Sequence, residues 1–362
     1  MLLEEIIIQK IQQEGPMSFR DFMEMALYYP ELGYYNATQD RIGVKGDFYT
    51  SSTLSPVFGA MIGRQLEQMW DLLGRDAFTV VEYGAGTGSL CNSILDYLKN
   101  NEQLYSKLNY CIIEKSPAMR EKEKTNLSKK VSWYDSILDL PPISGCILSN
   151  ELVDNFSVHQ VVMEEELMEV FVDYREGFVE LLKPASPALT DYLVELNVQL
   201  PKGFRTEINL EATKWIQEIA TSLKQGYVIT IDYGGQSSEL YRESRSTGTL
   251  VCFNKHQVYD HPYLNIGAQD ITAHVNFSAL IHWGLKEGLA CCGITNQGHF
   301  LTALGFSEYL MKTADPRQDM VQAARKVAFL NHKLLIDMGS KFKVLIQGKE
   351  TPKQELIGLK LS

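Results

Sequence analysis

A short apolar run followed by three alternating glycines constrains the fold more than any other feature of the sequence. Residues 78–83 read FTVVEY and lead directly into a turn that contains Gly84, Gly86 and Gly88. The apolar run predicts a buried strand, and residues 89–99 have the spacing of an amphipathic helix. The sequence therefore predicts a strand, a tight turn in which the backbone approaches a ligand closely, and a helix.

The same alternation of strands and helices continues along the chain. The predicted strands span 78–83, 109–114, 131–134, 145–150, 227–234, 289–296 and 341–349, and the helices between them span 89–99, 117–127, 209–226, 277–288 and about 316–338. Such alternation indicates a parallel sheet with helices on both faces. The final hairpin makes the last strand antiparallel, so we predict an α/β, Rossmann-like, seven-stranded and mainly parallel sheet of the kind found in class I methyltransferases.

Two regions depart from the alternation of strands and helices, and they suggest how the chain is organised. The stretch SVHQVVMEEELMEVFVDYREGFVELLKP predicts three short strands with tight turns, which form a meander rather than a βα unit. The predicted regions are an N-terminal helical segment with a following loop (1–74), a core (75–156 and 205–350) with a mobile loop (235–250) and a covering segment (250–276), and an inserted meander and helix (157–204).

The spacing of the glycines narrows the choice of ligand. A dinucleotide fingerprint requires G-x-G-x-x-G, but Ser89 stands at the position of the third glycine. A phosphate-binding Walker loop requires a lysine that is missing after Gly88. S-adenosylmethionine fits better, because Glu82 precedes the turn and Glu114 ends the next strand, where a carboxylate can bind both ribose hydroxyls. Asp135, after the third strand, contacts the adenine or caps the following segment.

Acidic residues follow the fourth strand of the core, in the stretch SNELVDNF. This stretch brings Asn150, Glu151 and Asp154 to the strand end that faces the methyl group in a methyltransferase. A carboxylate pair suits a guanidinium, which it binds through charge-assisted hydrogen bonds. The alternative is that Glu151 caps a helix and Asp154 is a solvated turn residue.

Two further polar residues have open roles. His274 either holds a carboxylate on the acceptor side or is a structural histidine with its hydrogen bonds satisfied. Asp232 ends the fifth strand, where it either lines the site or belongs to a turn. His256 and His261 lack metal-ligand spacing, and we expect no metal.

Charge and composition limit the partners. The formal charge of −11 argues against a nucleic-acid partner, which usually requires a basic face. An acidic surface suits a basic target, although it also serves solubility alone. No stretch is long and apolar enough for membrane insertion, and the N-terminus lacks the pattern of a signal peptide. None of the six cysteines forms a C-x-x-C pair, so we expect reduced thiols in a cytoplasmic protein.

Several blocks occur together in an order that resembles a known family. The blocks are GDFYTSSTLSPVFGAMIG (46–63), EYGAGTGSL (82–90), IIEKSPAMRE (112–121), SNELVDNFSVHQV (149–161), ITIDYG (229–234) and GAQDITAHVNFSAL (267–280). Together they resemble the MidA-type family, the bacterial relatives of the mitochondrial complex I assembly methyltransferase, over roughly residues 15–348. The first and last blocks are more specific than the glycine turn.

The resemblance implies a class I S-adenosylmethionine-dependent methyltransferase with an added substrate-covering region. Because the mitochondrial member is a protein arginine methyltransferase that acts on a subunit of complex I, a protein substrate with an arginine acceptor is implied. The residues that the resemblance assigns are Gly84, Gly86, Gly88 and Glu114 at the cofactor, Gly46, Asp47, Thr50 and Ser51 in a loop near it, and Asn150, Glu151 and Asp154 at the acceptor.

The sequence departs from the family pattern at two places. Thr53 stands where an acidic residue is common, and the residues after Asp154 lack a small-apolar-proline ending. These departures leave the shape of the acceptor pocket open. Two alternatives to an arginine methyltransferase remain: an assembly factor that binds S-adenosylmethionine without catalysis, and a methyltransferase of small molecules. The presence of Glu151 and Asp154 favours an enzyme, and the sequence does not indicate an oligomeric state.

Overall fold

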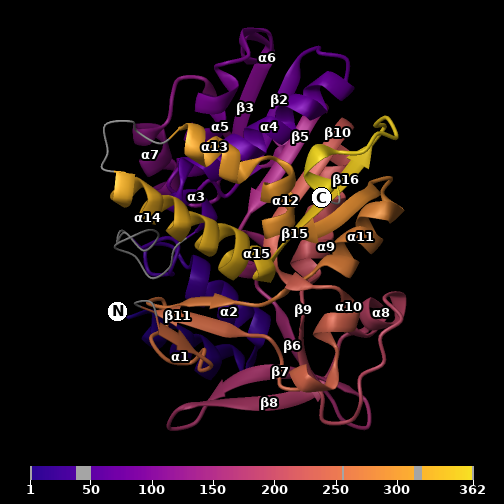
Figure 1. The fold of residues 1–362 in the computed structure, drawn as a ribbon. Helices are drawn as coiled ribbons and strands as arrows, with labels where there is room; N and C mark the ends of the chain where they lie inside the picture. The colour runs from indigo at the N-terminus through magenta and orange to yellow at the C-terminus, as the bar shows by residue number, and fades with distance from the viewer. Residues whose placement is uncertain (1, 38–49, 255–256, 314–319, 361–362) are drawn as a thin grey trace.

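A mostly parallel sheet forms the centre of the molecule (Figure 1). The computed structural model describes residues 2–37, 50–254, 257–313 and 320–360. In these residues the strands of the central sheet, in spatial order, are β15 (Ala290–Asn296), β16 (Phe342–Lys349), β10 (Leu223–Gly235), β5 (Ile143–Asn150), β2 (Phe78–Tyr83), β3 (Leu108–Ile113) and β4 (Val131–Tyr134), with the short β14 (Val275–Asn276) paired to the end of β10. Only β16 among these runs antiparallel to its neighbours. The predicted α/β fold is confirmed.

Helices cover both faces of this sheet because apolar side chains alternate along its strands. On β2, Val80 packs into one apolar cluster and Val81 into another on the opposite face. The first cluster includes residues of α4 (Pro56–Leu72), α5 (Ser89–Leu98), α12 (Gln297–Ala303) and α13 (Phe306–Lys312). The second includes residues of α9 (Leu210–Ser222) and α11 (Phe277–Lys286). Buried strands covered on both sides explain the near-continuous apolar runs in the sequence.

A second layer lies below the carboxyl ends of the central strands in Figure 1. It contains α1 (Leu3–Glu14), β1 (Met17–Ser18), α2 (Phe19–Tyr28), β6 (His159–Met163), β7 (Leu167–Tyr174), β8 (Phe178–Pro184) and β9 (Arg205–Ile208). Met17 and Ser18 pair with Val172 and Phe171 of the meander, so segments far apart in sequence share one sheet. The strand β9, which the predicted boundary at 205 assigns to the core, pairs with β6.

The structure contains further elements outside the strands and helices named so far. They are α3 (Ser51–Leu54), α6 (Glu102–Lys107), α7 (Pro117–Asn126), α8 (Pro187–Glu195), β11 (Val251–Asn254), β12 (Gln257–Tyr259), β13 (Asp270–Thr272), α14 (Met320–Asn331), the π-helix η4 (His332–Asp337) and α15 (Met338–Lys341). The predicted covering segment thus contains a small three-stranded sheet. In the part of the chain that the structure describes, no helix has the length and apolar character needed to cross a bilayer.

One local prediction was wrong. Gly226 does not end the helix that begins near Asn209, because α9 ends at Ser222 and Gly226 lies within β10. Gly226 faces Gly145 of β5, and a Cβ there would lie 2.0 Å from the Gly145 carbonyl oxygen, so close approach of the strands requires the glycine. The predicted mobile loop 235–250 contains α10 (Ser237–Leu240) and a 3-10 turn, η3 (Glu243–Arg245).

Candidate functional site

The glycine turn lies at the carboxyl end of β2 and leads into α5. Gly84, Gly86 and Gly88 have φ values of +62°, +60° and +76°, in the left-handed region that glycine adopts at little cost. A Cβ on Gly84 would lie 2.7 Å from Cδ1 of Leu152, so a larger residue would crowd the segment that follows β5. The turn ends at Gly88, the N-cap of α5.

Glu114 follows β3 at the same edge of the sheet and is largely buried. Its Oε1 accepts a hydrogen bond from the backbone N–H of Ser116 at 2.7 Å, while burial raises the pKa of the carboxyl. Arg120 on α7 donates to the Glu114 carbonyl at 2.6 Å and to the Tyr134 carbonyl at 3.3 Å, so it ties together the ends of β3 and β4. This places a carboxylate one strand away from the glycine turn.

Asp135 follows β4 and pairs with Arg120. Its carboxylate accepts a hydrogen bond from Arg120 at 2.6 Å, and its side chain is 85% exposed at the rim of the site. The following turn, η1 (Ile137–Asp139), is capped by Ser136, whose hydroxyl accepts from Leu138 N–H at 3.2 Å. The capping role predicted for Asp135 is therefore wrong, because the next residue performs it.

Glu82 lies within β2, beneath the glycine turn. Its Oε2 accepts a hydrogen bond from the Tyr110 hydroxyl at 2.5 Å, and burial raises the pKa of the carboxyl to about 7. This contact joins β2 to β3 inside the apolar core. Glu82 thus supports the strands from which the turn and Glu114 emerge.

Glu151 is the first residue after β5 and has an unusual backbone conformation. Its φ of +53° is uncommon for a residue other than glycine, and such strain concentrates at functional sites. Its Oε1 accepts hydrogen bonds from the backbone N–H of Ser51 at 2.8 Å and from Nδ2 of Asn150 at 3.1 Å. Burial raises the pKa of Glu151 to about 8, an effect that these two donors reduce.

Asp232 holds the turn that follows Glu151. Its Oδ2 accepts from the backbone N–H groups of Leu152, Val153 and Asp154 at 3.2, 2.8 and 3.4 Å. Burial raises the pKa of Asp232 to about 7. The sequence left its role open between lining the site and forming a turn at 232–235. In the structure Asp232 holds the turn that follows the neighbouring strand β5.

Asp154 lies in the 3-10 turn η2 (Val153–Asn155) and is 5% exposed. Burial raises the pKa of its carboxyl, the neighbouring carboxylates of Asp232, Asp270 and Glu151 raise it further, and a hydrogen bond with Tyr233 lowers it. Among the described residues, Oδ1 of Asp154 has no hydrogen-bond partner. A buried carboxyl oxygen without a partner is costly and is well suited to receive a donor from a ligand. The alternative prediction of a solvated turn residue is therefore wrong.

The acidic group of Glu151, Asp154 and Asp232 has no nearby cation in the described part of the chain. No Lys or Arg there forms an ion pair with any of the three carboxylates. The same described residues contain no group of His, Cys, Asp or Glu side chains with the geometry of a metal site. Buried carboxylates of this kind attract a positively charged ligand.

The partner of His274 differs from the predicted carboxylate. Nδ1 of His274 lies 2.7 Å from Nη1 of Arg245 and accepts its hydrogen bond. Burial and the charge of Arg245 lower the pKa of His274 to about 4, so the ring is neutral. The predicted contact of His274 with a carboxylate is wrong, because η3 places Arg245 beside the ring.

Thr50 and Ser51 begin α3, which packs against the acidic group. Thr50 caps this short helix, and its hydroxyl accepts from the N–H of Thr53 at 3.3 Å. The Thr53 hydroxyl in turn donates to the Thr50 carbonyl at 3.0 Å, so the residue that departs from the family pattern completes the cap. Gly46 and Asp47, also predicted near the cofactor, lie outside the described residues.

Two tyrosines that the sequence did not single out also reach this region. The hydroxyl of Tyr35 donates to Oδ1 of Asp270 at 2.9 Å, and the hydroxyl of Tyr28 donates to the Asn155 carbonyl at 3.0 Å. Their rings stack with centroids 5.5 Å apart. Neither residue belongs to a motif in the sequence, and only the fold brings them to this region.

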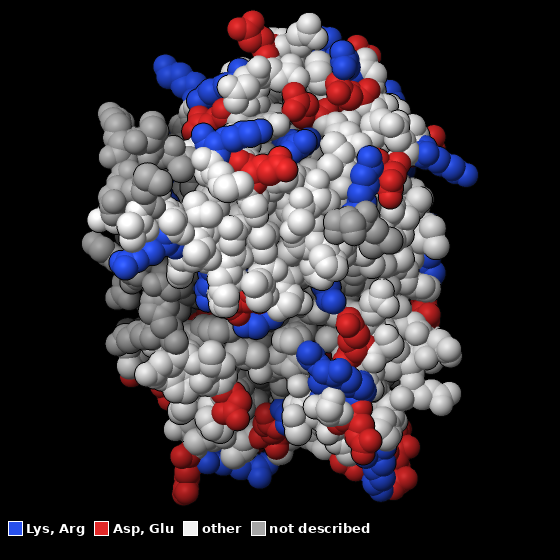
Figure 2. Space-filling view, in the orientation of Figure 1, with Lys and Arg blue, Asp and Glu red and all other residues white. Residues whose placement is uncertain are grey.

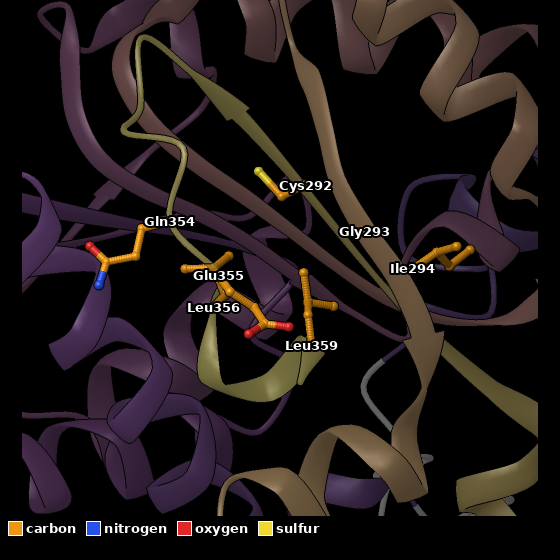
Figure 3. Close-up of a pocket in the computed structure, with 7 residues that line it drawn as sticks. All are labelled: Cys292, Gly293, Ile294, Gln354, Glu355, Leu356 and Leu359. Carbon is orange, nitrogen blue, oxygen red and sulfur yellow. The ribbon is translucent and has the colours of Figure 1, made fainter. Parts of the chain in front are cut away.

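Two described cavities lie elsewhere. A pocket of about 150 Å³ lies between β15 and the C-terminal segment, where Cys292, Ile294 and Leu359 line it (Figure 3). A shallower hollow of about 490 Å³ lies at the turn between α1 and α2. Neither is lined by the glycine turn or by Glu151, so the side-chain geometry at the sheet edge defines the candidate site.

Comparison with known proteins gives consistent results. Residues 61–295 match the family model Methyltransf_28, described as "Putative S-adenosyl-L-methionine-dependent methyltransferase". Similar proteins include the Caenorhabditis elegans protein arginine methyltransferase NDUFAF7 homolog, mitochondrial, with 26% identity over 94% of this chain and 85% of the relative. The Mus musculus protein arginine methyltransferase NDUFAF7, mitochondrial, has 29% identity over 85% of this chain and 75% of the relative.

A solved structure is also similar over nearly the whole chain. It is a COG1565 superfamily protein from Burkholderia thailandensis, bound to S-adenosyl-homocysteine. The two chains superpose with a TM-score of 0.87 and share 29% identity, over 98% of this chain and 94% of the other.

Proposed function

Because this chain belongs to the Methyltransf_28 family of S-adenosyl-L-methionine-dependent methyltransferases, we propose that it methylates an arginine side chain of a protein substrate. S-adenosyl-L-methionine is the cofactor of the family. Methyltransferase chemistry follows from this membership. The arginine acceptor is the part that we propose, and it rests on the acidic group at the sheet edge.

The residues at the sheet edge fit this cofactor. The backbone of the left-handed turn from Gly84 to Gly88 would contact the amino-acid end of the cofactor, and a Cβ on Gly84 would lie 2.7 Å from Cδ1 of Leu152 in the segment after β5. Glu114 offers carboxylate oxygens to two ribose hydroxyls from the adjoining strand end. When bound, S-adenosyl-L-methionine supplies an electrophilic methyl group on its sulfonium sulfur.

The acidic group carries the proposal for the acceptor. Asp154 and Asp232 are buried and Glu151 is half-buried at the ends of β5 and β10, and none of the three forms an ion pair with a Lys or Arg among the described residues. A guanidinium would neutralise this charge and donate to the unpartnered Oδ1 of Asp154. Bidentate binding would hold one guanidinium nitrogen in line with the methyl group, and such positioning supplies up to roughly 7–11 kcal/mol in related reactions.

Glu151 also provides a destination for a proton. When the acceptor nitrogen forms its bond to the methyl carbon and the sulfur–carbon bond breaks, that nitrogen must lose a proton. The carboxylate of Glu151 takes it and becomes neutral, the form that its burial favours. Asn150 and Ser51 hold Oε1 in place during this step.

The distribution of charge on the surface and the names of the similar proteins both support a protein acceptor. The names of the similar NDUFAF7 proteins describe them as protein arginine methyltransferases. Figure 2 shows basic and acidic side chains interspersed on one face, without the continuous basic patch that nucleic acids require. The cytoplasmic location and the domain boundaries stay predictions.

The proposal is tested by labelling. Lysate from cells that lack this protein is incubated with S-adenosyl-L-methionine carrying a radioactive methyl group, with or without the purified protein. We expect a labelled polypeptide whose hydrolysate contains methylarginine. Label in a small molecule, or in a polypeptide at another amino acid, would overturn the proposed acceptor. Calorimetric binding of S-adenosyl-homocysteine, measured on the same sample, distinguishes a wrong acceptor from an inactive preparation.

A further inference from the structure

Gln297 is a fully buried polar residue beside the site. It is the first residue of α12 and directly follows β15, whose carboxyl end lies at the same edge of the sheet as that of β5. Both ends of its amide are engaged. Oε1 accepts from the Ser51 hydroxyl at 3.1 Å, and Nε2 donates to the Leu334 carbonyl at 3.2 Å. The side chain therefore has one orientation that satisfies both neighbours.

The Leu334 carbonyl is presented by an irregular segment of helix. Residues 332–337 form the π-helix η4, and π-helical turns occur frequently at functional sites. Two glycines let this segment approach α12 closely: a Cβ on Gly298 would lie 2.2 Å from the Leu335 carbonyl oxygen, and one on Gly339 would lie 2.8 Å from that of Leu334. The backbone is thus built so that Gln297 reaches the Leu334 carbonyl.

The other end of this chain of contacts is Glu151. Ser51, whose hydroxyl is held by Gln297, donates its backbone N–H to Oε1 of Glu151 at 2.8 Å. Ser51 is itself fully buried, and its hydroxyl also lies 3.9 Å from the sulfur of Met338. We propose that Gln297 is a positioning residue that holds Ser51 against Glu151 and so sets the orientation and ionisation of that carboxyl.

The function of this contact rests on the proposed function, in which Glu151 faces the acceptor and takes its proton. The titratable groups that face Glu151 are Asp232 on β10 and Asp154 in η2, and both disfavour its ionised form. Neither Ser51 on α3 nor Gln297 on α12 carries a titratable group. Burial raises the pKa of Glu151 to about 8, and the Ser51 N–H is one of the two hydrogen bonds that lower it.

The structure supplies a matched control for a test. Gln347 on β16 is also fully buried and also donates through Nε2 to a backbone carbonyl, that of Leu280, at 3.2 Å. It makes no hydrogen bond to Ser51 or Glu151 among the described residues. We would compare Gln297→Met with Gln347→Met. Methionine keeps the shape of the side chain and removes the amide in both variants.

The readout is the pKa of Glu151, measured in the full-length protein by ¹³C NMR with glutamate labelled at Cδ. The Glu151 signal is assigned by its absence in Glu151→Gln. We expect Gln297→Met to raise this pKa by about one unit, because one charge-assisted hydrogen bond is misaligned. Gln347→Met should leave the pKa unchanged. Equal shifts in both variants, or none in Gln297→Met, would overturn the proposal.

Ser51→Ala keeps the test decisive if Gln297→Met does not fold. It removes the hydroxyl but keeps the backbone N–H, so we expect a shift in the same direction. The double variant should shift the pKa no further than the larger single change, because both break one chain of contacts. Additive shifts would contradict this chain. Since these measurements need no acceptor, they can succeed where the labelling experiment fails, and the reverse also holds.

Discussion

The carboxylate of Asp232 lies 2.8 Å from the backbone nitrogen of Val153, so the end of β10 fixes the turn that follows β5. The neighbouring N–H groups of Leu152 and Asp154 point to the same oxygen. The position of Asp154 at the acceptor side therefore depends on a residue about 80 positions away in sequence. Substitution of Asp232 tests this dependence.

Replacing Asp232 by Asn should disturb the turn and reduce methyl transfer strongly. The amide keeps one acceptor oxygen but loses the charge that binds three N–H groups, so we expect a loss of stability of about 1–3 kcal/mol. Urea unfolding and label transfer measure the two effects. Glu169→Gln is the control, because Glu169 is also buried but contacts His159 in the second layer. Full transfer by Asp232→Asn would show that the turn does not need this charge.

Methyl transfer should increase with pH through a midpoint near 8. Burial raises the pKa of Glu151 to about 8, and only its ionised form accepts a proton or binds a guanidinium. Below the midpoint, kcat/KM should fall about tenfold per pH unit, because this ratio reports the free enzyme. Transfer of the labelled methyl group to the acceptor in the lysate is measured from about pH 6 to 9.5, a range that brackets the expected midpoint. A flat profile would exclude Glu151 as the base.

Glu114→Ala should weaken cofactor binding. Loss of two hydrogen bonds to ribose hydroxyls is expected to reduce affinity for S-adenosyl-homocysteine about 10- to 100-fold. Calorimetric titration measures this loss. Glu121→Ala on the exposed face of α7 is the control, since Glu121 only pairs with Lys124. Equal affinities for the two variants would place the ribose elsewhere.

Gly84→Ala should cost more than Gly74→Ala. Both glycines have positive φ, +62° and +89°, so alanine adds backbone strain of roughly 1–2 kcal/mol at either position. Only Gly84 has a neighbour in the way, Cδ1 of Leu152 at 2.7 Å, whereas a Cβ on Gly74 meets nothing within 4 Å. Urea unfolding should show the difference in stability. Only Gly84→Ala should also weaken binding of S-adenosyl-homocysteine. Equal losses of affinity in the two variants would argue against a contact between the Gly84 turn and the cofactor.

Glu123→Gln should stabilise the protein at high pH. Glu123 is fully buried on α7, and burial raises the pKa of its carboxyl to about 8. An acid whose folded pKa is raised above the unfolded value, about 4.3, reduces stability as pH rises from that value to 8. Glutamine removes this penalty and can keep the hydrogen bond from Trp133. The Tm of the variant should match that of the wild type near pH 4 and exceed it at pH 8. A constant difference across this range would contradict the shifted pKa.

The sequence predicted the sheet well because the apolar runs of its strands come from burial on both faces, which the order of residues records directly. Gly226 shows where prediction from the local sequence fails. A glycine after a helical pattern is typical of a helix end, but here it lies beside Gly145 of a strand that the local sequence cannot place.

The candidate site was predicted only in part for the same reason. Glu114 and Glu151 follow strands, so the fold class alone brings them to the edge of the sheet. Gln297 and Asp232 act on segments that are far away in sequence, and no spacing indicates such contacts. The role of His274 stayed open in the sequence because its partner, Arg245, lies in a segment expected to be a loop.

The pairing of β1 with β7 has a consequence for the order in which the protein is made. Met17 and Ser18 leave the ribosome long before their partners, Val172 and Phe171. By then β2, β3, β4 and β5 have already been synthesised, and with them the edge that carries Glu114 and Glu151. The first strand therefore cannot form its pair with the meander until the chain that carries Glu114 and Glu151 has been synthesised.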